Sequence, residues 1–408
     1  MPSPAALVAG GSLCVLAFLA ALARRDLVVA MGVLLLGVVQ FEPAPSDGLF
    51  GVVIGLSAVT GHLRIGRLPM GITVLLALYA AMSLMSVTEA IYLGPAVLYL
   101  TITLYLLAFA VWLALYVDSE ARARLVARAY VAGAVTMATV STLAIFGALP
   151  GGELLLAEDA TRAKGLFKDP NVFGPFLVPA GLLLVQEYID PHLLRLKRRT
   201  SLLLLAIVAA GVLVSYSRAA WASFVVGIVI MLVVTVMRRR GRRRALALVS
   251  ALATIALALL AVVALTGSGS FLNQRASLQS YDAQRFAAQS SGFALAGEHP
   301  LGVGPGQFEV YEPLSAHSLY VRAVAEQGYF GFALLIGLVG MTLALACRNA
   351  LRGRSAWGIG SAALLAAWCG ILFNSAFVDT LHWRHLWFVA ALIWAASLRP
   401  QAGAARSA

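Results

Sequence analysis

Charged residues are scarce in this chain of 408 residues: Asp, Glu, Lys and Arg make up 12% of it, against 61% hydrophobic residues. A soluble domain does not carry so much apolar surface. Apolar runs of about 17–25 residues, the signature of bilayer-spanning helices, recur along the chain. A spanning β-barrel would need polar and apolar residues in alternation, which runs such as 246–265 do not show. The sequence therefore predicts an all-α polytopic membrane protein.

Cysteine is also scarce, with Cys14, Cys347 and Cys369 lying in or beside apolar runs without paired spacing. This pattern supports neither a disulfide framework nor a metal site. No charged segment precedes the first apolar run, so that run reads as a first span and not as a cleaved signal peptide. We treat residues 1–408 as a single transmembrane domain.

Twelve or thirteen spans are expected, with boundaries that vary by a few residues and a possible re-entrant break at PAPSD. The candidate spans are 5–23, 27–43, 47–61, 68–88, 95–117, 125–148, 171–188, 201–216, 219–237, 245–266, 328–346, 357–377 and 385–398.

The net charge of +12 is distributed unevenly between the links that join these spans. Strongly basic links at 195–199, 238–244 and 348–354 fall on one side, which the positive-inside rule makes cytoplasmic. This explains the positive charge without a nucleic-acid partner. The opposite, extracytoplasmic side then holds a smaller loop at 149–170 and a long loop at 267–318.

Ionisable groups are nearly absent from the centres of the spans and gather at the extracytoplasmic face. A transporter usually keeps polar groups near the midplane of the membrane. The distribution favours a surface active site acting on a substrate that hangs from a lipid.

Two arginine-bearing segments stand out on that face. Arg162, Lys164 and Lys168 precede a span that Asp169 or Asn171 is expected to cap; for Arg162 we favour anion binding over interfacial anchoring. The corner Ser215–Arg218 joins two apolar runs with almost no link, and there we favour a guanidinium that grips phosphate over a snorkelling arginine with a Tyr belt residue.

Residues 281–296 read as a short amphipathic helix on the membrane, with Phe286, Phe293 and Leu295 as its apolar contacts. Arg285 either points into a cleft or is a solvated cation, and spacing alone leaves both open. The glycines of 302–306, Gly304 among them, permit either an anion-binding nest of backbone N–H groups or a plain turn.

His317 lies where the long loop ends and a helix is expected to begin. Histidine titrates near neutral pH, so it can act as a general base; an interfacial histidine at a helix start is the alternative. The segment His382–His385 can be read as a metal pair, but an aromatic interfacial belt is favoured there.

Taken in order, the segments RAKGLFKDPNVFG (162–174), Ser217-Arg218, EHPLGVGPGQF (298–308) and AHSLYVRAVAEQGYFG (316–331) resemble the O-antigen ligase and polymerase family of bacterial membrane glycosyltransferases. The motif resemblance covers residues 162–337. Three positions depart from the pattern: Ser318 where Asn is common, Ala219 where Gly is frequent, and Arg322 where an apolar residue is usual.

The resemblance implies the helical architecture of lipid-carrier glycosyltransferases (GT-C-like), with no metal and no other cofactor. It implies a donor glycan on undecaprenyl diphosphate, used at the periplasmic face of the bacterial inner membrane. His317 matches the family's loop histidine, and Arg162, Arg218 and Arg285 match its arginines. Arg322, Gly304 and Lys164 are secondary candidates for the site.

The expected reaction is that of an O-antigen ligase, with lipid A–core or another glycan as acceptor. His317 would act as the general base, the arginines would clamp the diphosphate, and the anomeric carbon would be inverted. A polymerase that uses a lipid-linked repeat as acceptor is the close alternative. A transporter of lipid-linked sugars is a more distant one.

Overall fold

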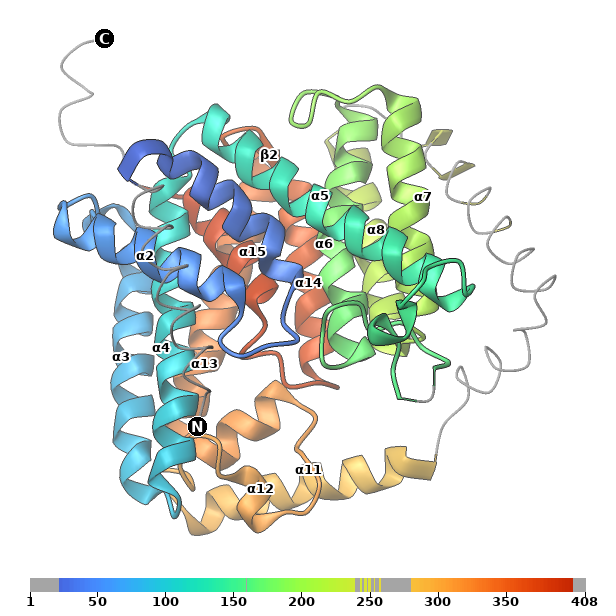
Figure 1. Ribbon diagram of the computed structural model, residues 1–408. Helices are drawn as coiled ribbons and strands as arrows, with labels where there is room; N and C mark the ends of the chain where they lie inside the picture. Colours follow the sequence, from blue (N-terminus) through green and yellow to red (C-terminus); the bar gives the residue numbers. More distant parts are fainter. Residues whose placement is uncertain are drawn as a thin grey trace.

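The computed structural model describes residues 22–158, 160–238 and 280–398, with a few positions between 243 and 257. Helices dominate this part of the chain (Figure 1). The α-helices are α2 (Pro45–Val59), α3 (Met70–Ser86), α4 (Leu93–Tyr116), α5 (Glu120–Ile145), α6 (Pro170–Ile189), α7 (Arg198–Val214), α8 (Arg218–Met237), α11 (Ser280–Glu298), α12 (Phe308–Tyr311), α13 (Leu319–Arg352), α14 (Ser361–Ser375) and α15 (Arg384–Ala395). Residues 22–34 are also helical.

The remaining regular elements are short. The 3₁₀ helices are η1 (Leu35–Gly37), η2 (Ile65–Arg67), η3 (Val87–Glu89) and η4 (Gly152–Leu155), and the strands β1 (Ser355–Ala356) and β2 (Ile359–Gly360) pair antiparallel. Within the described residues, strands thus form only one small hairpin.

Six of the described helices are long and apolar enough to cross a membrane: Met70–Glu89, Leu93–Tyr116, Glu120–Ile145, Pro170–Ile189, Arg218–Met237 and Leu319–Arg352. Three shorter apolar helices, α2, α14 and α15, accompany them. This confirms an all-α polytopic membrane protein. Almost all of the predicted spans 5–23 and 245–266 lies outside the described residues, and the total of twelve or thirteen stays a prediction.

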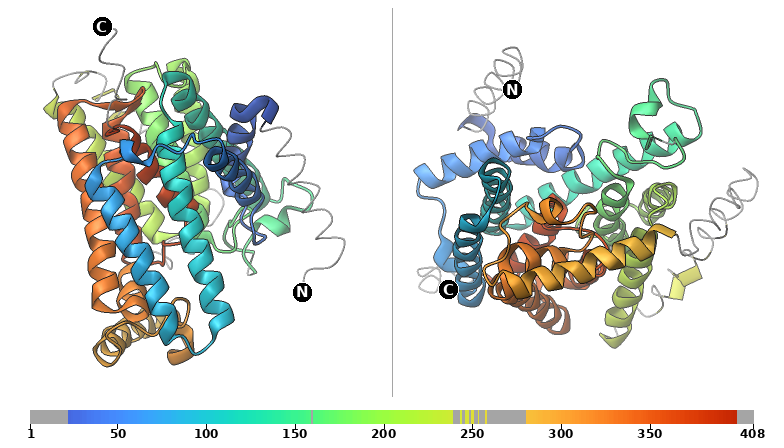
Figure 2. Two further views of the ribbon diagram at one scale, coloured as in Figure 1. Left: turned by 90° about the vertical axis from the view of Figure 1, so that its left-hand side faces the viewer. Right: turned by 90° about the horizontal axis from the view of Figure 1, so that it is seen from below.

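Helix α6 forms the centre of one half of the bundle. It packs on α5, α7, α8 and α14 (Figures 1 and 2). Of its most apolar stretch of 18 residues, 89% is buried inside the protein. Outer helices such as α3 and α8 instead expose large apolar side chains, among them Leu78, Leu84, Val225 and Val229. Apolar side chains on the outside suit a surface that faces lipid.

Local capping signals set the starts of three helices near the predicted site. The side chain of Asp169 caps α6 by accepting from the Asn171 N–H at 2.7 Å, with Pro170 at the first helical position, as the sequence predicts. Ser217 caps α8 and Ser318 caps α13 in the same way. These caps satisfy backbone donors that a helix start leaves unpaired.

Two predicted boundaries are wrong. The span expected at 328–346 belongs to a helix that begins at Leu319, because the polar segment 319–327 is also helical and joins the apolar part at a kink where Gly328 has φ 65°. The span expected at 27–43 ends in η1 by Gly37, and a separate helix begins at Pro45. The helix that the sequence predicts after His317 therefore carries Glu326 and continues across the kink into the apolar part.

Candidate functional site

The first arginine-bearing segment and the Ser215–Arg218 corner lie together in the structure. Arg162 donates from Nε to the Ser215 carbonyl at 3.2 Å and from Nη2 to Asn171 Oδ1 at 3.1 Å. The backbone N–H of Ala163 donates to the Val214 carbonyl at 2.9 Å. The two segments, which the sequence analysis describes as separate candidates, are therefore in direct contact. Arg162 bridges the start of α6 and the Ser215–Arg218 corner.

The corner itself is tightly packed. Tyr216 is buried with φ 48°, a left-handed conformation that is uncommon for a residue other than glycine. Its ring packs edge-on against Trp221 at 6.2 Å between centroids. Tyr216 thus packs inside the protein and does not lie at the membrane interface, which was the alternative considered for it. Arg218, half-buried, follows as the first residue of α8.

The two lysines of the first segment have different surroundings. Lys168 forms an ion pair with Glu42, with 2.9 Å between Nζ and Oε1. Lys164 is half-buried, and its backbone N–H donates to the Leu155 carbonyl at 2.9 Å. Lys168 is therefore partly neutralised, and Lys164 remains the secondary candidate of this segment.

His317 immediately precedes the cap of α13. It is half-buried and has φ 43°, again in the left-handed region. The next side chain, Ser318, accepts from the Val321 N–H at 3.5 Å and donates to the Ser375 carbonyl at 3.4 Å. The backbone at His317 is thereby tied to the end of α14, and sparsely populated backbone conformations of this kind cluster at functional sites.

The packing of α8 on α14 brings Arg218 to the same end of the bundle as His317. The two helices run antiparallel, because a Cβ on Gly370 would lie 3.1 Å from the Ser223 carbonyl and one on Gly227 would lie 3.5 Å from the Ala366 carbonyl. Five residues beyond the first contact, roughly 7.5 Å of helix, lead to Arg218 on α8 and to the C-terminus of α14. The end of α14 therefore lies between the Arg218 corner and the His317 segment.

Helix α11, which the sequence predicts as a short amphipathic helix, packs against the first turn of α13. A Cβ on Gly292 would come within 2.4 Å of Val321 Cγ1. Phe286 and Phe293 are exposed, as expected of apolar contacts for a membrane. Leu295 instead packs inward against a small core formed by Phe308, Ala316, Val321 and Ala325, which corrects its predicted role. Arg285 belongs to α11, but its side chain lies outside the described residues.

The glycine loop does form a nest, and the anion in it belongs to the protein. The N–H groups of Gly306 and Phe308 donate to the two carboxylate oxygens of Glu326, at 2.9 and 3.2 Å. The N–H of Gly304 donates to the Glu326 carbonyl at 3.1 Å. Gly304 has φ 98°, and a Cβ there would lie 2.9 Å from Ala90 Cα. The described contacts thus give Gly304 a role in loop packing.

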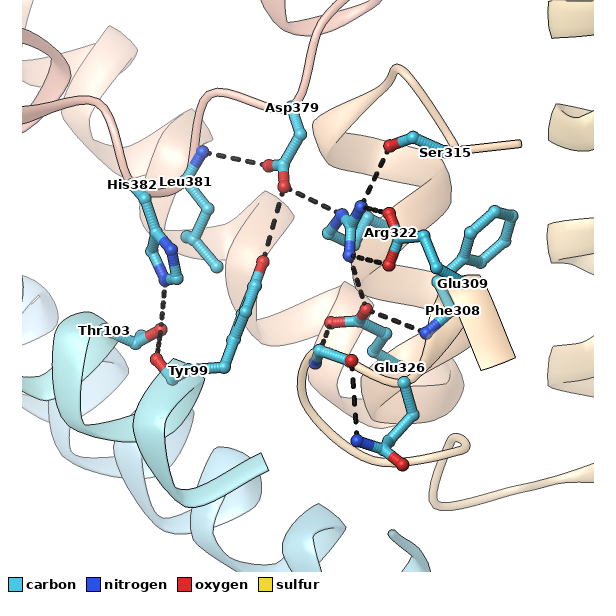
Figure 3. A network of polar contacts seen from close by, with 12 residues as sticks. Tyr99, Thr103, Phe308, Glu309, Ser315, Arg322, Glu326, Asp379, Leu381 and His382 are labelled. Atoms are coloured by element: carbon cyan, nitrogen blue, oxygen red, sulfur yellow. Dashed lines mark hydrogen bonds and ion pairs between the residues drawn. The ribbon is translucent and has the colours of Figure 1, made fainter. Parts of the chain in front are cut away.

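Arg322 is the centre of a buried ionic network that the sequence did not reveal (Figure 3). Its guanidinium pairs with Glu326 at 2.7 Å and with Asp379 at 2.8 Å, and it also pairs with Glu309. Ser315 Oγ accepts from it at 3.0 Å. The carboxylates come from α12, α13 and the α14–α15 connection. Arg322 therefore ties three segments together, and its donors face carboxylates of the protein.

One sequence signal pointed to part of this network: Arg322 and Glu326 stand four residues apart, a spacing at which helical side chains pair. Glu309 and Asp379 carried no such signal, because their proximity to Arg322 depends on the tertiary fold. Burial by itself would raise the pKa of Glu309, but hydrogen bonding and attraction from Arg322 outweigh it and hold that pKa below its ordinary value.

The network continues through Asp379 to α4. Asp379 accepts from the Tyr99 hydroxyl at 3.4 Å, and the Tyr99 ring packs on His382 with 4.1 Å between centroids. His382 Nε2 lies 2.9 Å from Thr103 Oγ1. Burial lowers the pKa of His382 to about 4, so its ring is neutral at pH 7.

The prediction of an aromatic interfacial belt at residues 382–385 is wrong. Trp383 and His385 are buried in the main core, and Arg384 donates from Nε to Asp47 Oδ1 at 2.8 Å. Within the described part of the chain, no group of three or more His, Cys, Asp or Glu side chains is placed to hold a metal ion.

Comparison with known families gives one match: the family model described as O-Antigen ligase matches residues 203–336. The matched segment runs from α7 through α8 and α11 into α13 and includes Arg218, Arg285, Gly304, His317 and Arg322. Arg162 and Lys164 precede it in the chain, and Arg162 contacts it through the Ser215 carbonyl. No curated protein matches the chain.

Proposed function

We propose that this chain, which its matching segment assigns to the O-antigen ligase and polymerase family, is an O-antigen ligase. Proteins of this family are glycosyltransferase-like ligases and polymerases. The proposed reaction transfers a glycan from undecaprenyl diphosphate to a hydroxyl of lipid A–core. The observation that carries the proposal is the Arg162 bridge, which sets one guanidinium beside the Arg218 corner at the end of the bundle where His317 lies.

The leaving group explains the need for arginines. A diphosphate carries at least two negative charges, and stabilising charge that develops on a leaving group is often the largest catalytic contribution. Arg218 and Arg285, supported by Arg162, clamp the diphosphate, because a planar guanidinium binds two phosphate oxygens at once. Lys164 adds positive charge beside them. The arginines thereby take the part that a metal ion plays in other phosphate-releasing sites.

His317 acts as the general base. A neutral ring nitrogen takes the proton from the acceptor hydroxyl while the hydroxyl oxygen attacks the anomeric carbon from the face opposite the diphosphate. The bond from the anomeric carbon to the diphosphate oxygen breaks, its electron pair stays on undecaprenyl diphosphate, and the anomeric centre inverts. The positive φ of His317 supports this role, because the fold maintains an uncommon backbone conformation at that residue.

The basic links support a periplasmic position for this end of the bundle, because links rich in Lys and Arg favour the cytoplasmic side. Residues 195–199 and 348–354 follow α6 and α13 at the other end of those helices. The proposed reaction therefore uses a donor and an acceptor that face the periplasm.

A substitution by glycine tests His317 most directly. Gly adopts a positive φ without strain, so His317→Gly removes the imidazole and keeps the backbone. With purified protein, a labelled lipid-linked glycan and lipid A–core, we expect transfer to fall by about 10²–10⁴-fold with an unchanged melting temperature. His317→Ala should be equally inactive. Full transfer by both variants would disprove the base assignment.

A conservative substitution tests the clamp. Arg218→Lys keeps the charge but loses the two-pronged contact, so transfer should fall at least about tenfold. Arg352→Lys, at the exposed end of α13, is the matched control and should retain activity. Equal activity of the two variants would remove Arg218 from the site.

The acceptor distinguishes the ligase from its alternatives. Product that forms only when lipid A–core is present identifies a ligase, whereas glycan lengthening with the lipid-linked donor alone identifies a polymerase. Either product formed in detergent, where no membrane separates two compartments, excludes a role confined to transport.

A further inference from the structure

A charged cavity lies among segments that the proposed active site does not use. Its volume is about 340 Å³, and its wall includes four arginines and two aromatic side chains: Arg25, Arg64, Arg67, Arg122, Trp112 and Tyr116. The residues come from the helix at 22–34, the α2–α3 link, the end of α4 and the start of α5. Segments distant in sequence therefore converge on one cationic hollow.

Helix α4 shows how far this cavity lies from the glycine loop. At the start of α4, the Tyr92 N–H donates to Gln307 Oε1 at 2.9 Å, whereas Trp112 and Tyr116 in the last turns of the helix line the cavity. The 24 residues of α4 span about 36 Å, roughly a bilayer with part of its interfaces. The cavity thus opens at the opposite end of the bundle, which the charge bias places on the cytoplasmic side.

The carboxylates nearby do not neutralise the cavity. Arg122 pairs with Asp118 at 2.9 Å, and its Nε lies 3.8 Å from Asp26. Among the described residues, no carboxylate forms an ion pair with Arg25, Arg64 or Arg67. An excess of positive charge therefore faces the cavity.

Arg25 has unused hydrogen-bonding capacity there. Its Nη2 donates to Ser57 Oγ at 2.6 Å, and its guanidinium carbon lies 5.8 Å from the centre of the Trp112 ring. Its Nε, like that of Arg67, is buried without a hydrogen-bond partner in the described structure. Burial, followed by repulsion from Arg122, lowers the pKa of Arg25. An anion in the cavity would offset the repulsion between Arg25 and Arg122.

We propose that this cavity binds the phosphate group of an anionic ligand at the membrane face opposite the active site. Guanidinium forks match phosphate oxygens in geometry and charge, and the aromatic side chains hold Arg25 in place. The volume lies within the range of small-molecule sites and holds a phosphate with a short polar substituent such as glycerol. The phosphate would belong either to a lipid headgroup or to a soluble phosphate compound.

The test uses the full-length purified protein and the double variant Arg64→Gln/Arg67→Gln. These two side chains are exposed and half-buried, so the substitution leaves the core intact. Arg24→Gln is the control, because Arg24 is exposed and does not line the cavity. One arm measures retention of phosphatidylglycerol against phosphatidylcholine by native mass spectrometry. The other titrates glycerol 3-phosphate and inorganic phosphate against the lipid-free protein by thermal shift.

We expect the double variant to bind the phosphate probe about 30-fold more weakly, because about 1 kcal/mol for each of two arginines amounts to about 2 kcal/mol. Arg24→Gln should bind as the parent protein does. Arginine-dependent retention of phosphatidylglycerol alone identifies a lipid headgroup as the source, and an arginine-dependent response to the soluble probes identifies a free phosphate. Binding that is equal in all three proteins, or absent in both arms, overturns the proposal. Glycan transfer is not the readout, so failure here is distinct from failure of the proposed function.

Discussion

Removal of the guanidinium at the centre of the buried network should destabilise the protein strongly. Arg322 is 7% exposed and Glu326 is 2% exposed. In Arg322→Ala, the carboxylates of Glu326, Glu309 and Asp379 would remain close together without the cation that all three contact. The variant therefore combines lost attraction with uncompensated repulsion and burial of charge.

The size of the effect follows from this arrangement. Breaking a buried ion pair by removing one partner typically costs about 3–5 kcal/mol. Arg322 forms ion pairs with three carboxylates. Glu309 and Asp379 are partly exposed, so solvent screening weakens their attraction to Arg322. We therefore expect a loss of about 3–5 kcal/mol at neutral pH. The loss should shrink in acid, because carboxylates left without the guanidinium can then take up protons.

Reversible unfolding of the purified protein in detergent measures this loss, with a melting temperature as a second reading. Arg352→Ala is the matched control, since Arg352 is an exposed arginine in the last turn of the same helix, and it should change stability by less than about 1 kcal/mol. If both variants unfold alike, the carboxylates do not depend on Arg322 and the reasoning fails.

Two further predictions concern the surroundings of this network. Gly304→Ala should lower the free energy of unfolding by about 2 kcal/mol, because a Cβ there meets Ala90 and the φ of 98° suits glycine. Gly297 lies on a helix with open space around it, so Gly297→Ala should be neutral or stabilising in the same unfolding assay. Equal effects of the two substitutions would refute the packing argument. For His382, the fold lowers the pKa from 6.5 to about 4. The free energy of unfolding should therefore be highest above about pH 6.5 and fall by about 3 kcal/mol as the pH drops toward 4, because the unfolded chain takes up the proton first. His382→Gln should flatten this part of the stability–pH curve, and an unchanged curve would contradict the burial of a neutral ring.

Motif order located several parts of the candidate site without the fold. Local rules were sufficient for the cap of α6 at Asp169, the start of a helix after His317, and an amphipathic helix carrying Arg285. Each of these features depends on neighbours within a few residues along the chain. The roles assigned to His317 and to the arginines remain predictions.

The errors arose where a long-range contact decides the environment of a side chain. The glycines of 302–306 predict a possible nest of backbone N–H groups, and the structure contains one. The tertiary fold decides that the Glu326 carboxylate is the anion bound in it. The segment at 382–385 has the composition of an interfacial belt, yet the packing of α15 buries Trp383 and His385. Aromatic and histidine side chains suit both settings, so composition does not distinguish them.

The amino-acid sequence by itself determined that this chain is a helical membrane protein, because apolar run length and the distribution of charge follow directly from the cost of placing polar groups in hydrocarbon. The order of its motifs also predicted a resemblance to the O-antigen ligase and polymerase family, whose model matches residues 203–336. Only the tertiary structure decided which charges meet: it linked Arg162 to the corner before Arg218 and surrounded Arg322 with carboxylates. The strength of an ionic contact depends on distance and burial in space, and neither is encoded in the spacing of residues along the chain.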